Sequence, residues 1–198
     1  MRPQRHAILR TDCPVLLDKM FNDISQQLID NVDWLDLAYG QAERIMQRTE
    51  KFERTYLPAY YMQGEDYENL LPDDRKGNYS FFTVDDNQSI ESAKGRPARI
   101  SGTFNLIVWL NMRTLTNGWG KEQAKNAILN ALTALNVSYG HFQVTNIFER
   151  AEAVFSGFTL EEVENQYMTY PFCGFRFVCD YTIRQDCFET GGARVWPY

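Results

Sequence analysis

Histidine and cysteine are scarce in this sequence, and neither occurs with the spacing of a metal site. The 198 residues include two histidines and four cysteines. His6 and His141 each lack a second histidine two or four residues away, which excludes a histidine-rich metal site. No C-x-x-C pair exists among the cysteines, which are Cys13, Cys173, Cys179 and Cys187. Because Cys173 and Cys179 fall in one predicted strand, roughly 20 Å apart when extended, we expect buried free thiols there and not a disulfide.

Motifs for catalysis and nucleotide binding are also missing. The sequence contains no G-x-S-x-G, no G-x-x-x-x-G-K-[ST] and no G-x-G-x-x-G. Gly118-Trp119-Gly120 lacks the third glycine and the Lys-Ser/Thr pair of a phosphate loop, so we expect a strand-to-helix turn there. Residues 65–75 are acidic but do not match the spacing of an EF-hand loop. The sequence therefore predicts no enzyme, no catalytic residue, no cofactor and no metal ion.

Basic residues are the minority, and no long apolar run is present. Lys and Arg number 20 against 26 Asp and Glu, which gives a net charge of −6 at pH 7. An electrostatic nucleic-acid binder needs clustered Lys and Arg, so this balance argues against that class. No apolar run approaches the ~18 residues of a membrane helix, and no signal peptide follows the basic N-terminus. We therefore expect no membrane contact, and a protein that is made and used in a cytosol or released from one by lysis.

Two long segments alternate between apolar and polar residues with the period of a β-strand. In 99–113 the even positions are mostly apolar, and in 172–184 the odd positions are apolar. Ile107 and Trp109 interrupt the polar face of the first segment at its middle. Two long strands, each with one solvent-exposed face, predict an antiparallel sheet whose other face is covered by helices.

Two amphipathic segments supply those helices. Apolar residues in 14–30 recur with helical spacing, and alanines in 121–135 form a stripe small enough to lie close against a sheet. The predicted fold class is therefore α+β: an antiparallel sheet with long amphipathic strands at 99–113 and 172–184, packed on one face by helices at 14–30 and 121–135. The composition, 44% hydrophobic and 14% aromatic, fits a single globular domain over residues 1–198.

The remaining segments are predicted from local composition. Segment 56–62 is expected to be an edge strand, because Pro58 cannot donate a hydrogen bond to a central ladder. Segment 41–54 is polar and compatible with a helix. The other expected elements are strands at 79–84 and 142–148, an extension of the latter strand through 151–158, a short helix or turn at 160–166, and polar loops at 64–78 and 85–97.

The two chain ends carry residues without a place in the predicted core. The basic N-terminal arm, residues 1–12, has no helical or strand period, and the aromatic C-terminal tail is residues 188–198. An exposed aromatic tail is unfavourable in a monomer and suits a pocket on a neighbouring subunit, whereas the arginines suit an acidic neighbour. The residues expected in protein interfaces are Arg2, Arg5, Arg10, Trp196 and Tyr198.

The order of these parts carries a family resemblance. An amphipathic helix precedes Trp-Leu-Asp-Leu-Ala-Tyr-Gly at 34–40, Tyr-Leu-Pro-Ala-Tyr-Tyr at 56–61 and Leu-Pro-Asp-Asp-Arg-Lys-Gly-Asn-Tyr-Ser-Phe-Phe at 71–82. A long strand, a helix and a closing aromatic strand follow. This arrangement resembles the neck and tail-completion (tail terminator-like) proteins of tailed bacteriophages, in particular the crAss-like group.

The resemblance implies a structural role and carries no catalytic residues. Proteins of this kind are α+β subunits that assemble into rings of six or twelve copies. The ring joins other neck, portal or tail proteins in the virion, and DNA passes through its lumen without specific binding. The virion is assembled in the host cytoplasm. Two other classes stay open: a cytosolic protein-binding adaptor module that is a monomer or dimer, and a small soluble enzyme.

Overall fold

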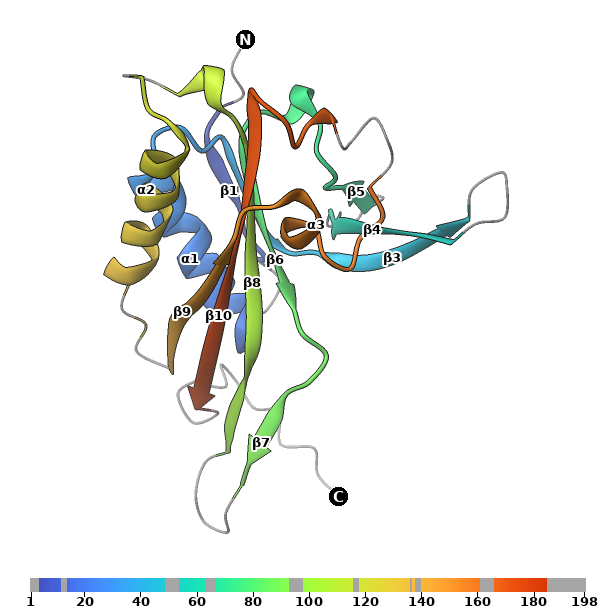
Figure 1. Cartoon of the computed structure of the whole chain (residues 1–198). Helices are drawn as coiled ribbons and strands as arrows, with labels where there is room; N and C mark the ends of the chain where they lie inside the picture. Colours follow the sequence, from blue (N-terminus) through green and yellow to red (C-terminus); the bar gives the residue numbers. More distant parts are fainter. Residues whose placement is uncertain are drawn as a thin grey trace.

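A seven-stranded mixed sheet forms the centre of the molecule (Figure 1). The computed structural model describes residues 4–11, 14–48, 54–62, 67–92, 98–115, 118–135, 137, 140–160 and 166–184. The spatial order of six strands is β1-β2-β6-β8-β10-β9, and the short β7 pairs with β8 outside this path. Their bounds are β1 His6–Ile8, β2 Leu37–Gln41, β6 Tyr79–Val84, β7 Ser89–Glu91, β8 Arg99–Asn111, β9 Gly140–Phe148 and β10 Phe172–Arg184. These strands, with the helices described below, confirm the predicted α+β class.

Strands β8 and β10 are the long pair that the alternation predicts. They run antiparallel in continuous register, from Arg99 opposite Arg184 to Asn111 opposite Phe172. The period-two pattern places one full set of apolar side chains on a single face, so a shift by one residue would expose the whole set. The sequence therefore predicts both strands and an antiparallel sheet, and the structure adds that the two strands are neighbours.

The N-terminal edge of the sheet is parallel, which the sequence did not predict. Strand β1 pairs in parallel with β2, and β2 pairs in parallel with β6. Helix α1, Leu17–Asn31, connects β1 to β2, and a parallel pair requires such a crossover. The expectation that residues 4–11 have no strand structure is wrong, because His6–Ile8 form the edge strand.

Both long helices cover the same face of the sheet, as predicted (Figure 1). Helix α1 and helix α2, Lys121–Ala134, share one hydrophobic core with β8 and β10. The ring of Phe21 stacks on Phe82 with centroids 4.3 Å apart. Cys173 and Cys179 lie in this core as buried free thiols, which confirms their prediction. Among the described residues, no helix is long and apolar enough to cross a membrane.

A second core covers part of the opposite face and corrects the expectation of a fully solvated surface. Ile107 and Trp109 are 1% and 0% exposed, and they pack with aromatic residues of β2, β4 and β6. The covering elements are helix α3, Ala151–Val154, and a small sheet of β3 Glu43–Arg48, β4 Arg54–Tyr61 and β5 Tyr67–Asn69. The indole of Trp109 donates to the carbonyl of Tyr167 at 2.7 Å, which satisfies its buried N–H.

Several local predictions are wrong. Strand β4 is the central strand of the small sheet and not an edge. Its pairing with β5 ends where Ala59 lies opposite Asn69, so Pro58 has no paired residue on the β5 side. Segment 41–54 holds strand β3 instead of a helix, and residues 151–154 form α3 instead of extending β9. The predicted loops contain β5, β7 and a 3-10 turn at Asp74–Lys76, and a second 3-10 turn spans Met112–Thr114. Most of the expected helix at 160–166 lies outside the described residues.

Candidate functional site

Ionisable and nucleophilic side chains do not gather into a centre in the described part of the chain. No group of three His, Cys, Asp or Glu residues there is placed to hold a metal ion. His6 lies on β1 and His141 on β9, the two opposite edges of the main sheet, and both are exposed. The surfaces that could bind another macromolecule are therefore the candidate sites.

Arg5, a predicted interface residue, is engaged within its own chain. Its guanidinium donates to the carbonyl oxygens of Leu35 at 3.0 Å and Val32 at 2.9 Å, and also to that of Ile29. The carbonyls of Ile29 and Val32 lie at the C-terminal end of α1, where a positive charge and hydrogen-bond donors are favourable, and that of Leu35 lies in the segment that follows the helix. Arg5 therefore caps this helix; its predicted contact with a neighbouring subunit stays a prediction.

Arg10 is fixed to the first turns of α1 while its charge remains near solvent. Its backbone N–H donates to Asn22 Oδ1 at 2.9 Å, and Asn22 Nδ2 donates to its carbonyl at 2.8 Å. Its guanidinium lies 3.1 Å from Asp18, and 61% of the side chain is exposed. Arg10 is thus available at the surface. Arg2, Trp196 and Tyr198, the other predicted interface residues, lie outside the described residues.

A groove of about 790 Å³ runs between strand β1 and the end of β4. Tyr60, Tyr61 and Met62 form one side, and residues of β1 form the other. The ring of Tyr60 lies over Gly40, where a Cβ would approach its Cε2 to 3.2 Å, so glycine makes room for this ring. Burial raises the pKa of Tyr60, and the charge of Arg10 acts in the opposite direction. This volume is in the range of small-molecule and peptide sites.

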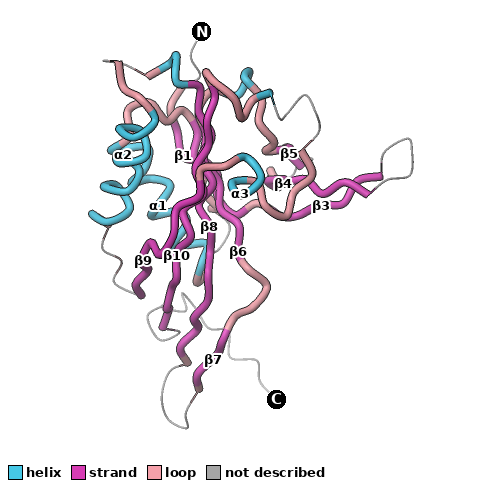
Figure 2. Tube along the Cα trace, in the orientation of Figure 1, coloured by secondary structure: helices cyan, strands magenta, loops and turns pink. Residues whose placement is uncertain are grey.

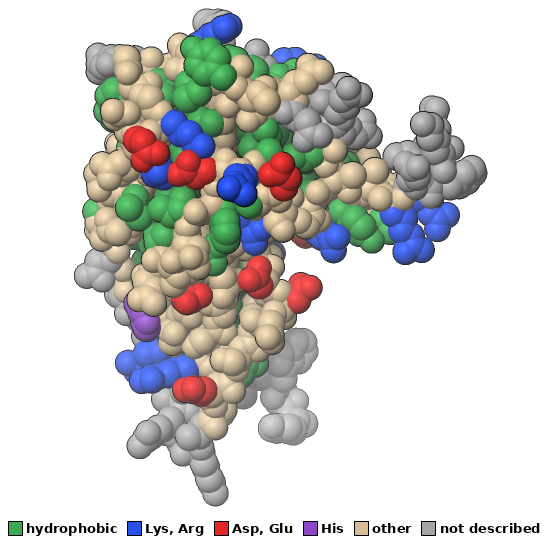
Figure 3. Space-filling view, in the orientation of Figure 1, with side chains coloured by type: hydrophobic (Ala, Val, Ile, Leu, Met, Phe, Trp, Pro, Cys, Tyr) green, Lys and Arg blue, Asp and Glu red, His purple; other side chains and the backbone are tan. Residues whose placement is uncertain are grey.

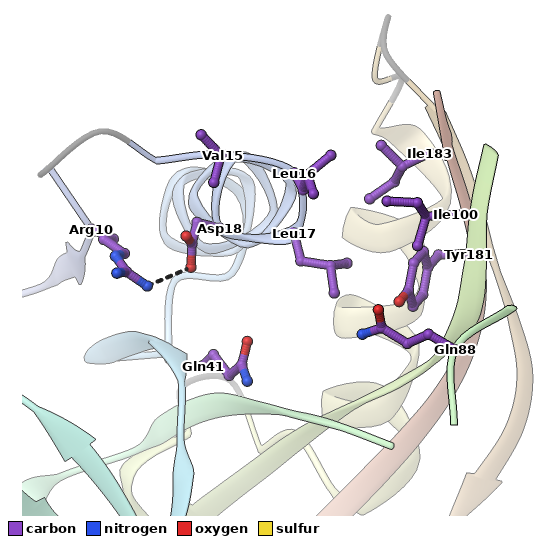
Figure 4. Close-up of a pocket in the computed structure, with 10 residues that line it drawn as sticks. All are labelled: Arg10, Val15, Leu16, Leu17, Asp18, Gln41, Gln88, Ile100, Tyr181 and Ile183. Atoms are coloured by element: carbon purple, nitrogen blue, oxygen red, sulfur yellow. Dashed lines mark hydrogen bonds and ion pairs between the residues drawn. The ribbon is translucent and has the colours of Figure 1, made fainter. Parts of the chain in front are cut away.

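A smaller pocket of about 260 Å³ adjoins this groove, because Arg10, Asp18 and Gln41 line both (Figure 4). One wall comes from the start of α1 and the other from the ends of β8 and β10. The residues of these two walls are Val15, Leu16, Leu17, Ile100, Tyr181 and Ile183. The side chains of Gln41 and Gln88 add polar groups along one edge (Figure 4).

Tyr181 is the unusual residue of this pocket. It is 2% exposed, and its hydroxyl oxygen has no hydrogen-bond partner among the residues that the structure describes. Its ring lies over Gly102 of β8, where a Cβ would come within 3.0 Å of the hydroxyl oxygen. Burial raises the pKa of Tyr181, so the phenol is neutral and able to donate. The alternation of β10 predicts that this ring is buried, but no sequence signal indicates its unpaired hydroxyl.

A two-stranded arm, defined as β3 with the paired part of β4, projects from the body of the molecule (Figure 2). Arg48 and Arg54 face each other at the last pair of this ladder. Near the body, Arg44 lies over the ring of Tyr56 at 3.8 Å and donates to the carbonyl of Gly157 at 2.9 Å. Figure 3 shows basic side chains gathered along the arm. The arm is therefore anchored at its base and carries two arginines at its last described pair.

An acidic patch, defined as Asp85, Asp86 and Asp180, lies on the open part of the main sheet. All three side chains are exposed, and Figure 3 shows acidic groups over the lower half of this face. Thr103 donates to Asp180 at 3.1 Å, and Asn105 donates to Asp85 at 3.1 Å. The strand residues thus hold these carboxylates in place while leaving them accessible. The polar positions of β8 and β10 predicted this exposed surface, but not its charge.

Comparison with known proteins adds no relationship: no family model, no curated protein and no solved structure matches this chain.

Proposed function

We propose that this chain is a structural virion protein that forms a ring in the neck of a tailed bacteriophage. The ring lies between portal and tail and surrounds the channel through which the genome passes. The observation that carries the proposal is the projecting arm with its paired arginines on a molecule whose open sheet face carries the acidic patch. A subunit whose arm fits a complementary surface on the next copy can associate head to tail. Such contacts form a closed ring when the rotation between neighbouring subunits divides a full turn evenly.

The charge arrangement of the arm favours a partner. Arg48 and Arg54 stand directly opposite each other, and like charges at such positions destabilise a two-stranded ladder. An acidic surface relieves this repulsion. The acidic patch of a second copy has the required charge, and Met46, 50% exposed on the same arm, adds apolar area for contact.

The overall charge is compatible with a channel wall. The net charge of −6 gives little attraction for a passing polyanion, so DNA moves through without specific binding. Six or twelve copies would give a closed assembly of this kind. A second candidate is a cytosolic adaptor that is a monomer or dimer, and the groove beside β1 favours it, since an extended peptide fits such a site.

A charge-swap experiment tests the ring. Arg48→Glu with Arg54→Glu should shift the mass of the purified protein, measured by light scattering, from oligomer towards monomer. Adding Asp86→Arg and Asp180→Arg to the same chain should restore the oligomer, because the attraction is rebuilt with reversed signs. Arg113→Glu with Arg150→Glu, two exposed arginines away from the arm, is the matched control. A mass that does not respond to the arm substitutions would contradict the proposal.

A further inference from the structure

The pocket between the start of α1 and the ends of β8 and β10 has the properties of a receptor for an apolar side chain. Leu16 and Leu17 face Ile100 and Ile183 across about 260 Å³ (Figure 4). An engineered apolar cavity of about 150 Å³ holds benzene, so this pocket has room for a bicyclic aromatic ring. Polar groups lie at its edge, where the carboxamides of Gln41 and Gln88 can each donate or accept.

The buried hydroxyl of Tyr181 indicates that the ligand also carries a hydrogen-bond acceptor. A buried O–H without a partner is rare in native proteins, and its hydroxyl end points into the pocket (Figure 4). A peptide carbonyl beside an inserted side chain would accept a hydrogen bond from this hydroxyl. Leu16, the only non-glycine residue with a positive φ in the described ranges, holds its side chain on the pocket wall at φ 49°. The pocket therefore suits a peptide segment with a large aromatic side chain.

The chain itself contains such a segment. Residues 185–198 lie outside the described residues, and their sequence ends in Val195-Trp196-Pro197-Tyr198. The last described residue, Arg184, follows the pocket residue Ile183. From there to Trp196 an extended chain spans up to about 40 Å, which is enough to reach a neighbouring molecule. Each copy thus carries both a receptor and an insert, the arrangement that a head-to-tail ring requires.

We propose that Trp196 of a second copy inserts into this pocket, and that Tyr181 donates its hydroxyl proton to a backbone carbonyl of the inserted segment. The inference rests on the proposed ring and identifies one of its contacts. The indole N–H of Trp196 finds an acceptor in the carboxamide of Gln41 or Gln88. Insertion covers the pocket and provides the missing partner of Tyr181.

Photo-crosslinking of the full chain tests this contact directly. Val15, 57% exposed at the pocket rim, is replaced by p-benzoylphenylalanine in a mixture of unlabelled and ¹⁵N-labelled protein. We expect crosslinked peptides that join position 15 to 185–198 and contain one unlabelled and one labelled partner. The same probe at Glu152, exposed on α3, is the control and should not reach that segment. Crosslinks within single copies only, or an assembled sample without crosslinks to 185–198, would overturn the proposal.

Two variants separate the contact from folding. Trp196→Ala should weaken association by about thirty-fold, as expected for a buried aromatic anchor. Tyr181→Phe should weaken association by about three- to ten-fold, since one hydrogen bond is lost, and should not lower the melting temperature of the monomer. Normal association of both variants would refute this inference and leave the ring intact. A wild-type protein that stays monomeric would refute the ring and this contact together.

Discussion

Replacing Leu106 by alanine should destabilise the protein strongly, because this side chain lies at the centre of the core beneath the helices. Leu106 is 0% exposed on β8, with Phe82 opposite on β6 and Phe177 opposite on β10, both also 0% exposed. Removing its methyl groups loses about 2 to 3 kcal/mol of transfer free energy. Both neighbouring strands are fixed by their own pairing, so they cannot move to fill the cavity that the smaller side chain leaves. The cavity raises the expected loss in the free energy of unfolding to about 3–5 kcal/mol.

Urea unfolding of Leu106→Ala beside Ile90→Ala measures this loss. Ile90 lies on β7 of the same sheet and is 69% exposed, so its truncation should change the free energy of unfolding by less than about 0.5 kcal/mol. The urea midpoints of the variants are compared only if the free energy of unfolding depends on urea concentration with the same slope in each. A changed slope indicates a changed denatured or native state. A loss below about 1 kcal/mol at Leu106, or equal losses at both sites, would refute the assignment of this face to the core.

Three further predictions address other parts of the structure. Gly102→Ala presses a methyl group against the ring of Tyr181 and should lower the free energy of unfolding by about 1–3 kcal/mol, which thermal melting would detect. The displaced ring should also narrow the small pocket, which a crystal structure would show. Burial raises the pKa of Cys173 to about 11 and of Cys179 to about 12, so at pH 8 neither thiol should react with a disulfide reagent until urea unfolds the protein. Peptide mapping separates these two sites from Cys13 and Cys187, and rapid labelling of Cys173 or Cys179 in the native state would contradict their burial. Arg5→Ala removes the cap of α1 and should lower the free energy of unfolding by about 1–3 kcal/mol, whereas the exposed Arg113→Ala should have almost no effect.

The long strands were predictable because the alternation of apolar and polar residues that stabilises each of them lies within a single segment of the sequence. The alternation in the thirteen residues of β8, which only Ile107 and Trp109 interrupt on the polar side, places most of its apolar side chains on one face. The same holds for α1 and α2, whose apolar stripes match the sheet that they cover. In each case burial of a continuous face outweighs weaker local preferences.

The elements that the sequence did not predict depend on contacts between distant segments. Strand β1 has three residues and exists because β2 provides an edge for parallel pairing. Pro58 is tolerated in a central strand because its β5 partner is short. Ile107 and Trp109 interrupt the polar face of β8 in the sequence, but the second core that buries them depends on the small sheet, which no local pattern predicted.

The candidate site was predictable only in part, for the same reason. The sequence indicated exposed aromatic and basic groups at the chain ends, but not that Arg5 would bond carbonyls 24 to 30 residues away, two of them at the end of α1. Gly102 within an otherwise regular strand is a signal for close approach of another group. Its partner, the ring of Tyr181, is set by the register of β8 and β10, which only the folded sheet fixes.

Native mass spectrometry of the purified full chain, with electron microscopy of the same sample, shows whether the protein forms a ring. We expect one closed species of six or twelve times 23.1 kDa, visible as a ring with a central channel. A single 23.1-kDa species at every concentration, or open aggregates without a ring, would contradict it.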